Sequence, residues 1–205
     1  MAIEIQGKVG KQELNKGAVS NLRMGRSGEL IVSQGHAHHK EAVTAGNVWI
    51  GANLGGTPVT TQAGLSATTP ALTLYNPTGS GVNLVLQSIT IDITTSPAAA
   101  SGIMLAYNLS NAAAPTLTTL ANVTNALLTK NGQPIGQCAR VSTLAAAPLA
   151  CRFLGGVTGA SAIGGLQLID NMEGEIILPP GVAVSIQTTA ALACLCSITW
   201  EEVPI

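Results

Sequence analysis

Three histidines within five residues are the first group in this sequence that could do chemistry. In the segment GHAHH (35–39), His36 and His38 would share one face of an extended chain, and imidazole binds transition metals. No cysteine or carboxylate completes a coordination set at a recognised spacing, and Glu41 is the nearest acid. Three copies around a symmetry axis could still build a site. We interpret the cluster as a solvated polar stretch and retain His36 and His38 as candidate metal ligands.

The cysteines form the second such group. Cys194 and Cys196 stand in a C-x-C pattern and would point the same way from a strand. A disulfide between same-face neighbours two residues apart is geometrically poor, so the pattern favours two packed core thiols. A bridge from one of them to Cys138 or Cys151 remains open.

No set of residues in the sequence predicts a catalytic centre. Nucleophilic hydrolysis needs a base and an orienting group, but all three histidines fall within the first 39 residues. The acids Asp170, Glu173 and Glu175 match no calcium loop, and GKVGKQ (7–12) lacks the spacing of a phosphate-binding loop. We interpret the acids as a solvated turn and predict that the protein is not an enzyme and holds no cofactor.

The scarcity of charge is the most unusual property of the composition. Only 9% of the 205 residues are charged, against about 25% in typical soluble proteins. Small polar and apolar residues must therefore form much of the surface, and a lone monomer of this kind tends to associate. We infer that other subunits cover a large part of the exterior.

The totals also argue against two kinds of partner. A net charge of −1 gives no general attraction to nucleic acid. No stretch reaches the 18 or so consecutive apolar residues of a membrane helix, and MAIEIQGKVGKQELNK at the start lacks the apolar core of a secretory signal. We predict neither a nucleic-acid partner nor a membrane partner.

The charge is distributed unevenly along the chain. Residues 1–44 hold ten charged residues with a net charge of +2, and the remaining 161 hold nine with a net charge of −3. The first part lacks the apolar surface to offset its ordering entropy. We predict an extended N-terminal arm over 1–45 that orders on a partner, the alternatives being a disordered tail or a small subdomain.

Residues 46–205 show the alternation of β-strands. The isoleucines of LQSITIDITT (86–95) face one way, and its Ser, Asp and Thr side chains face the other. Leu84 and Leu86 have the opposite parity, which predicts a β-bulge near Gln87–Ser88 or a change of sheet there. Similar patterns predict further strands at 47–53, 71–76, 102–109, 149–155, 165–170, 175–178, 181–189 and 192–203.

Turn residues separate these segments. Pro180 and Gly181 suit the two central positions of a tight reversal between two of the strands. Regularly spaced short strands without a strong helical pattern are typical of a β-sandwich or barrel. Only LTTLANVTNALL (117–128) spaces its apolar residues at helical intervals, and its Thr and Asn residues are poor helix formers. We predict a short helix or a loop there.

The five aromatic residues are too few to suggest a glycan platform. Trp49, Tyr75, Tyr107, Phe153 and Trp200 each fall in a predicted strand, so we expect them in the core. A glycan site would then have to use polar loops or subunit junctions.

Several segments resemble small virion structural proteins of tailed bacteriophages. They are LRMGRSGELIVSQGH (22–36), EAVTAGNVWIGAN (41–53), LYNPTGSGVNLVLQSI (74–89), GEIILPPGVAVSI (174–186) and SITWEEVPI (197–205). The resemblance implies a jelly-roll-like antiparallel β-sandwich, here assigned to 46–205, which forms a homotrimer in the virion after assembly in the host cytoplasm. It carries no catalytic residues over.

The expectation is therefore a decoration protein, or cement protein, of a phage capsid. It would stabilise the shell through symmetric contacts with itself and with the major capsid protein or other virion proteins. The basic arm residues are the predicted shell or subunit contacts, unless they only keep the arm soluble: Lys8, Lys11, Lys16, Arg23 and Arg26. The alternative expectation is a head-spike or tail-tip protein that binds the host surface.

Overall fold

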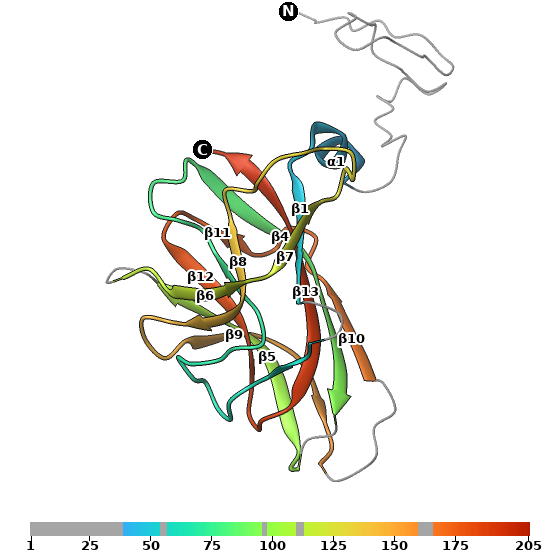
Figure 1. Cartoon of the computed structure of the whole chain (residues 1–205), viewed down its shortest axis with the longest axis vertical. Coiled ribbons are helices and arrows are strands. Elements are labelled where there is room, and N and C mark those ends of the chain that lie inside the picture. The colour runs from blue at the N-terminus through green and yellow to red at the C-terminus, as the bar shows by residue number, and fades with distance from the viewer. Residues whose placement is uncertain (1–38, 54–56, 96–97, 110–112, 160–165) are drawn as a thin grey trace, which may run out of the picture. The chain divides into compact units, whose positions relative to one another are not determined.

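A computed structural model describes residues 39–53, 57–95, 98–109, 113–159 and 166–205. The chain divides into two units, Met1–Lys40 and Glu41–Ile205, and the fold described is that of the second. It consists almost entirely of two antiparallel β-sheets packed face to face, which confirms the prediction of an all-β sandwich (Figure 1). Of the segment predicted as an arm, residues 1–38 lie outside the described residues.

The helix α1 (Lys40–Ala45) occupies the end of that segment and leads into the first strand. It stops at Gly46, whose φ of 73° is a left-handed conformation that glycine adopts without strain. The amides of Gly46 and Asn47 bond to the carbonyls of Val43 and Ala42 at 2.9 and 3.0 Å. This Schellman pattern satisfies the last helical carbonyls.

The seven-stranded sheet has the order β10-β4-β13-β1-β7, with β11 paired to β4 and β2 to β13. Its strands are β10 (Leu166–Asn171), β4 (Val82–Thr95), β13 (Ala193–Pro204), β1 (Val48–Ala52), β7 (Asn122–Asn125), β11 (Ile177–Leu178) and β2 (Val59–Thr60). The six-stranded sheet has the order β6-β8-β3-β12-β5-β9. Its strands are β6 (Thr116–Leu120), β8 (Gln137–Thr143), β3 (Thr73–Tyr75), β12 (Val182–Thr188), β5 (Ser101–Leu109) and β9 (Leu149–Val157).

Four strand pairs are nested along the chain. β1 pairs with β13, β3 with β12, β4 with β10, and β5 with β9, so early strands meet late strands in reverse order. The intervening strands extend this frame: β8 adds to β3, β6 adds to β8, and β7 adds to β1. The pairs alternate between the two sheets, as expected for a long strand hairpin rolled into a sandwich.

The long strands β4 and β13 form the centre of the seven-stranded sheet. Several of their inward side chains, such as those of Ile89, Ile91, Cys194 and Trp200, are at most 1% exposed. The register shifts between Ser88 and Leu86, which leaves Gln87 without a direct partner on β13. The predicted bulge is therefore confirmed, and it explains why the leucines before it and the isoleucines after it both face the core.

The Pro-Pro-Gly segment forms the predicted reversal, but the strands on either side belong to different sheets. The Val182 amide bonds to the Pro179 carbonyl at 3.2 Å, and Gly181 has a φ of 88°. β11 before the turn pairs with β4, whereas β12 after it pairs with β3 and β5. The turn therefore carries the chain from one sheet to the other.

The helix or loop predicted at 117–128 is wrong for most of that segment. β6 and β7 occupy it and are separated only by Ala121, whose amide bonds to the Cys138 carbonyl at 2.9 Å. β6 pairs in one sheet and β7 in the other, so this ribbon also passes between the sheets. Backbone pairing with β8 and β1 outweighs the helical spacing of the leucines.

The prediction that all five aromatic residues pack in the core is wrong for Phe153. Trp49, Tyr75 and Trp200 are buried and Tyr107 is half-buried, but Phe153 is 76% exposed. β9 carries two irregularities in its pairing with β5, and each extra residue reverses the side-chain parity of the strand. A simple alternation therefore assigns the wrong face to Phe153.

The chain itself covers much of the outer face of the six-stranded sheet. Ser185 and Gln187, which alternate with the core residues of β12, are at most 2% exposed. The segment before β3 lies against them: the Ser66 amide donates to Gln187 Oε1 at 3.2 Å. The Leu144 amide, after β8, bonds to the Ala67 carbonyl at 2.7 Å.

The two sheets approach each other closely at a glycine. A Cβ added to Gly51 of β1 would lie 2.6 Å from Cys138 Sγ of β8 and 3.1 Å from a ring carbon of Trp200. No L side chain fits there without a shift of the facing sheet. This position, rather than a loop, therefore fixes part of the spacing between the sheets.

Replacing Gly51 by Ala should lower the free energy of unfolding by about 1–3 kcal/mol, because the added methyl overpacks a closed interior. Urea denaturation followed by tryptophan fluorescence measures this. Adding Cys138→Ala should recover part of the loss, since it removes the clashing sulfur. Gly102→Ala is the matched control, because the nearest atom to its added Cβ is 3.5 Å away; a loss as large as that of Gly51→Ala would contradict the packing argument.

Candidate interaction surfaces

An ion-pair cluster connects the two sheets at one open side of the sandwich. Arg152 of β9, in the six-stranded sheet, contacts Asp170 of β10, in the seven-stranded sheet, with Nε 2.7 Å from Oδ2. Arg152 Nη1 also donates to Glu175. These hydrogen bonds, to Glu175 first and then to Asp170, raise the pKa of Arg152 above its ordinary value. The prediction of a solvated turn is wrong for Asp170, which lies in β10, whereas Glu175 lies after the strand and is exposed although it also pairs with Arg152.

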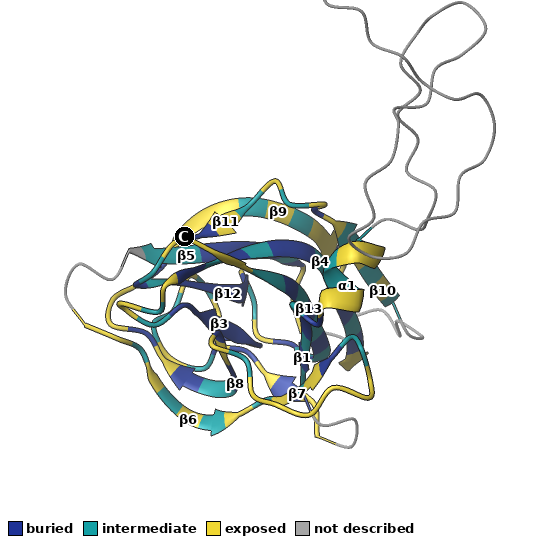
Figure 2. Cartoon of the chain, turned by 90° about the horizontal axis from the view of Figure 1, so that it is seen from above, coloured by how far each residue is buried: buried dark blue, intermediate teal, exposed yellow. Residues whose placement is uncertain are grey.

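The strand that carries Arg152 is an exposed edge. Among the described strands β9 pairs only with β5, and most of its residues are exposed (Figure 2). The pairing shifts twice, leaving Cys151 and Leu154 without direct partners on β5. Bulges and inward-pointing charges are devices that prevent edge strands from pairing with other chains. The β9 edge is therefore protected against simple edge-to-edge association.

Beside this cluster an apolar slot opens between the sheets, with a volume of about 240 Å³. Its walls come from β5, β9, β12 and the segment around β11. We call it the inter-sheet slot; it is lined by Tyr107, Cys151, Ile176, Ile177, Leu178, Pro179, Val182 and Val184. Leu178 and Val184 belong to the hydrophobic core, so the slot is an opening into the core rather than a surface depression.

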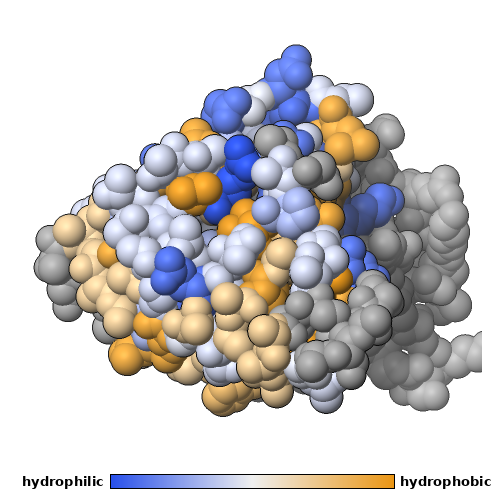
Figure 3. Space-filling view, turned by 60° about the horizontal axis from the view of Figure 1, so that its bottom comes forward, coloured by the Kyte–Doolittle hydropathy of each residue, from blue (hydrophilic) through white to orange (hydrophobic). Residues whose placement is uncertain are grey.

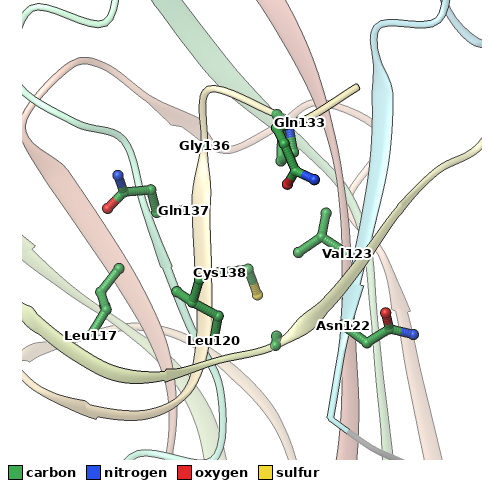
Figure 4. A pocket seen from close by; sticks show the side chains of 10 residues that line it. Leu117, Leu120, Asn122, Val123, Gln133, Gly136, Gln137 and Cys138 are labelled. Carbon is green, nitrogen blue, oxygen red and sulfur yellow. The ribbon is translucent and has the colours of Figure 1, made fainter. Parts of the chain in front are cut away.

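A larger pocket, of about 520 Å³, lies inside the bend where β6 passes into β7 (Figure 4). Leu117, Leu120 and Val123 surround the Cys138 side chain, and the amides of Gln133 and Gln137 lie at the rim. Cys138 is the only titratable residue among the described residues that line it. The pocket has no acid–base pair and therefore no basis for general acid–base catalysis.

The Cys138 thiol is not activated. Burial raises its pKa from 9.0 to about 12, whereas a nucleophilic cysteine needs a lowered pKa that supplies thiolate near neutral pH. Cys196 is also buried, and its hydrogen bond to Cys194 at 3.5 Å, together with desolvation, raises its pKa. Both thiols behave as small apolar core groups.

The four cysteines form no disulfide. Cys194 and Cys196 are buried core thiols, which confirms the favoured interpretation of the C-x-C pattern. The alternative bridge to Cys138 or Cys151 is wrong, because all four sulfurs are free. Cys151 differs from the others in being exposed.

Large apolar side chains are exposed at many places on the described surface. The described part of the chain has ten such exposed apolar residues and eleven charged residues. Figure 3 shows one face on which pale and orange side chains predominate over strongly hydrophilic ones. The ten are Leu65, Leu120, Leu128, Ile135, Leu149, Phe153, Ile169, Ile177, Val203 and Ile205.

Several of the few charged side chains bind the protein's own backbone. Glu202 Oε1 accepts hydrogen bonds from the amides of Ile135 and Gly136 at 2.7 and 2.8 Å. Lys130 Nζ donates to the Gly46 carbonyl at 2.6 Å and lies 5.9 Å from the centre of the Trp49 ring. These charges hold loops in place and contribute less than usual to hydration of the surface.

The predicted site residues all lie in the segment before the described structure. The histidines His36 and His38 and the five basic residues Lys8, Lys11, Lys16, Arg23 and Arg26 lie outside the described residues, so these assignments stay predictions. Within the described ranges, no group of three or more His, Cys, Asp or Glu residues is placed to hold a metal ion. In the same ranges no helix has the length and apolar character needed to cross a membrane.

Sequence reasoning missed both pockets. The inter-sheet slot combines residues from positions 107 to 184, and the larger pocket combines residues from 117 to 138. No periodic pattern marks either set. The sequence gives one signal for the inter-sheet slot. Consecutive apolar residues stand around the Pro-Pro-Gly turn, where a strand with one buried face would need an apolar residue only at every second position.

Comparison with protein-family models, with curated proteins and with solved structures finds no match for this chain.

We predict that a maleimide reagent modifies one thiol per native chain, at Cys151, and four after unfolding in guanidinium chloride. Cys138, Cys194 and Cys196 are buried, whereas Cys151 is exposed. Mass spectrometry of the intact protein counts the modifications. Cys151→Ser should reduce the native count to zero, and rapid native labelling of a second thiol would show that the core opens.

The free energy of unfolding should fall as the pH rises above about 9. The unfolded thiol of residue 138 ionises near pH 9.0, while the folded thiol stays protonated up to about 12. The stabilisation is fully present below pH 9 and is lost as the pH approaches 12, by about 1.4 kcal/mol per pH unit for one thiol. Urea denaturation at pH 7, 8, 10 and 11 measures the slope. Cys138→Ala should have a shallower slope above pH 9 and the same slope below it; equal slopes throughout would refute the assignment.

Proposed function

We propose that this protein is a structural component of a tailed-phage virion, a capsid decoration or cement protein that acts through symmetric contacts between copies. The observation that carries the proposal is the balance of the described surface, where exposed large apolar residues are nearly as numerous as all charged residues. Monomeric soluble proteins rarely expose extended apolar patches. A repetitive shell would cover such a surface with neighbouring subunits.

The physical basis of the proposal is the cost of removing ions from water. Burying an unpaired charge at an interface costs several kcal/mol, whereas Ser, Thr and aliphatic side chains pack against a neighbour at much lower cost. The outward side chains of β4, such as Ser88, Thr90 and Thr94, are of this kind. Repeating one modest contact over many copies multiplies its effect.

The strand topology supports the finer assignment of a jelly roll. The nested pairs β1–β13, β3–β12, β4–β10 and β5–β9 are divided alternately between the two sheets. Double-sheet jelly rolls with eight strands are common in viral capsid proteins. On this proposal, the segment 116–143 is an insertion between the fourth and fifth strands of the roll, β5 and β9. Fold alone does not define function, so the surface and the sequence resemblance carry the functional part.

The first test is the association state of the full chain. Sedimentation velocity from about 1 to 100 μM should give a stable oligomer, which we propose is a trimer, because contacts of about 1,600 Å² hold specific complexes together. A soluble monomer across this whole range would count against the proposal.

The second test is binding to particles of the encoding phage made without this chain. Added protein should saturate the particles at a fixed number of copies, counted by cryo-electron microscopy. The charge-reversed variant Lys8→Glu, Lys11→Glu, Lys16→Glu should bind more weakly, with the largest difference at low salt because exposed charges are screened. Glu29→Gln is the control and should bind at least as well as the native chain. Failure of the native protein to label any particle would overturn the proposal.

A further inference from the structure

We propose that the inter-sheet slot receives the aliphatic run Leu30, Ile31 and Val32 from the N-terminal segment of a second copy of this chain. The inference rests on the proposed function, in which copies lie next to each other. It assigns one of their contacts to a defined surface, and that contact is absent from the isolated fold.

The slot suits aliphatic side chains better than a free small molecule. Its volume of about 240 Å³ lies below the roughly 300–1,000 Å³ of sites that enclose drug-sized ligands. Its lining is apolar apart from the Tyr107 hydroxyl and the Cys151 thiol. A ligand held there would need no charge and few hydrogen bonds, which describes the side chains of Leu, Ile and Val.

The described residues leave the slot open. Ile177, on its wall, is 54% exposed, and Leu149, which pairs with the lining residue Tyr107, is 59% exposed. Covering exposed aliphatic carbon contributes about 25 cal/mol per Å². An apolar occupant would therefore gain affinity both from the slot and from these two side chains.

A second copy of the folded body is a poor occupant. The two pairing shifts in β9 and the inward ion pair of Arg152 with Asp170 disfavour extension of the sheet by another β9 edge. An extended segment is free of this restriction because it can insert side chains without a long regular backbone ladder.

The N-terminal segment has the required length, side chains and charge. Leu30–Val32 is the only run of three branched aliphatic residues in the first 38. From Ile31 to the start of the folded unit at Glu41, an extended chain can span about 33 Å. Residues 1–38 carry a net charge of +2 and the remainder −3.

The charge near the slot has the complementary sign. Two carboxylates, those of Asp170 and Glu175, pair with the single guanidinium of Arg152 close to the wall residue Ile176, so these three side chains carry a net charge of −1. Arg26 stands four residues before Leu30, which corresponds to about 13 Å in an extended chain. A basic segment docked with its aliphatic run in the slot would therefore place a guanidinium within reach of an acidic surface.

The exposed Cys151 thiol allows a direct test by disulfide trapping. Full-length Ile31→Cys, Cys151→Ala is mixed with full-length native protein and oxidised mildly with copper phenanthroline. The expected product links the thiol introduced at position 31 of one chain to Cys151 of the other, because a disulfide forms only when the two Cα atoms come within about 7 Å. Trypsin then releases peptide 27–40 joined to peptide 141–152, which mass spectrometry identifies.

Two matched variants make the test specific. Asn21→Cys, Cys151→Ala carries its thiol in the same basic segment but outside the aliphatic run, and should give about tenfold less cross-link. Ile177→Glu in the Cys151 partner alters an exposed wall residue, and should lower the yield at least tenfold because the docked side chain would meet a charge.

Other outcomes overturn the inference. The variant Ile31→Cys with native Cys151 carries both thiols in one chain. If the cross-link forms only within that chain, and never between the two chains of the mixture, the slot binds the chain's own N-terminal segment. A predominant Cys151–Cys151 product would assign it to body-to-body contact. Equal yields at positions 21 and 31 would show random collision. None of these results alters the particle-binding test, so the two proposals fail separately.

Discussion

The pairing of β4 with β13 is the constraint on which the rest of the structure depends. These two strands, of 14 and 12 residues, lie at the centre of one sheet, and their inward residues form much of the core. The bulge at Gln87 keeps both halves of β4 facing inward. Because β4 ends at Thr95 and β13 begins at Ala193, their pairing joins distant parts of the folded unit, and the pairs β4–β10 and β5–β9 form within the segment that it closes.

The same arrangement determines how the few charged residues are used. A rolled sandwich has open sides where the sheets diverge, and there the protein places Arg152 against Asp170 and Glu202 against the loop before β8. Each ionic group satisfies a structural need that hydroxyl or aliphatic residues could not meet. In this fold, charged side chains join the two sheets or hold loops at the open sides, and the broad faces of the sheets carry Ser, Thr and aliphatic residues. The low charge of the sequence is consistent with this division.

Much of this fold could be predicted from the sequence, because exposed and buried residues alternate in the long strands. The isoleucines of β4 and the C-x-C cysteines of β13 follow the period of two and were assigned to the correct face. Phe153 was misassigned because the bulges of β9 depend on its pairing with β5, which no local pattern encodes. The prediction of a helix or loop at 117–128 is wrong for a similar reason, because the strands in this segment are defined by pairing with partners distant in the sequence. Neither pocket could be predicted, because each is a gap between elements.

The protection of the β9 edge restricts the kinds of association that remain available. An edge with regular pairing would allow sheets to extend without limit and would favour aggregation. The shifts in β9 and the inward Arg152 oppose that route, yet exposed aliphatic groups persist beside them at Leu149 and Ile177. Such a surface favours contacts in which side chains enter a slot, which close at a fixed stoichiometry. On the proposal that copies of this chain associate in a defined number, apolar attraction and a blocked backbone edge would act together.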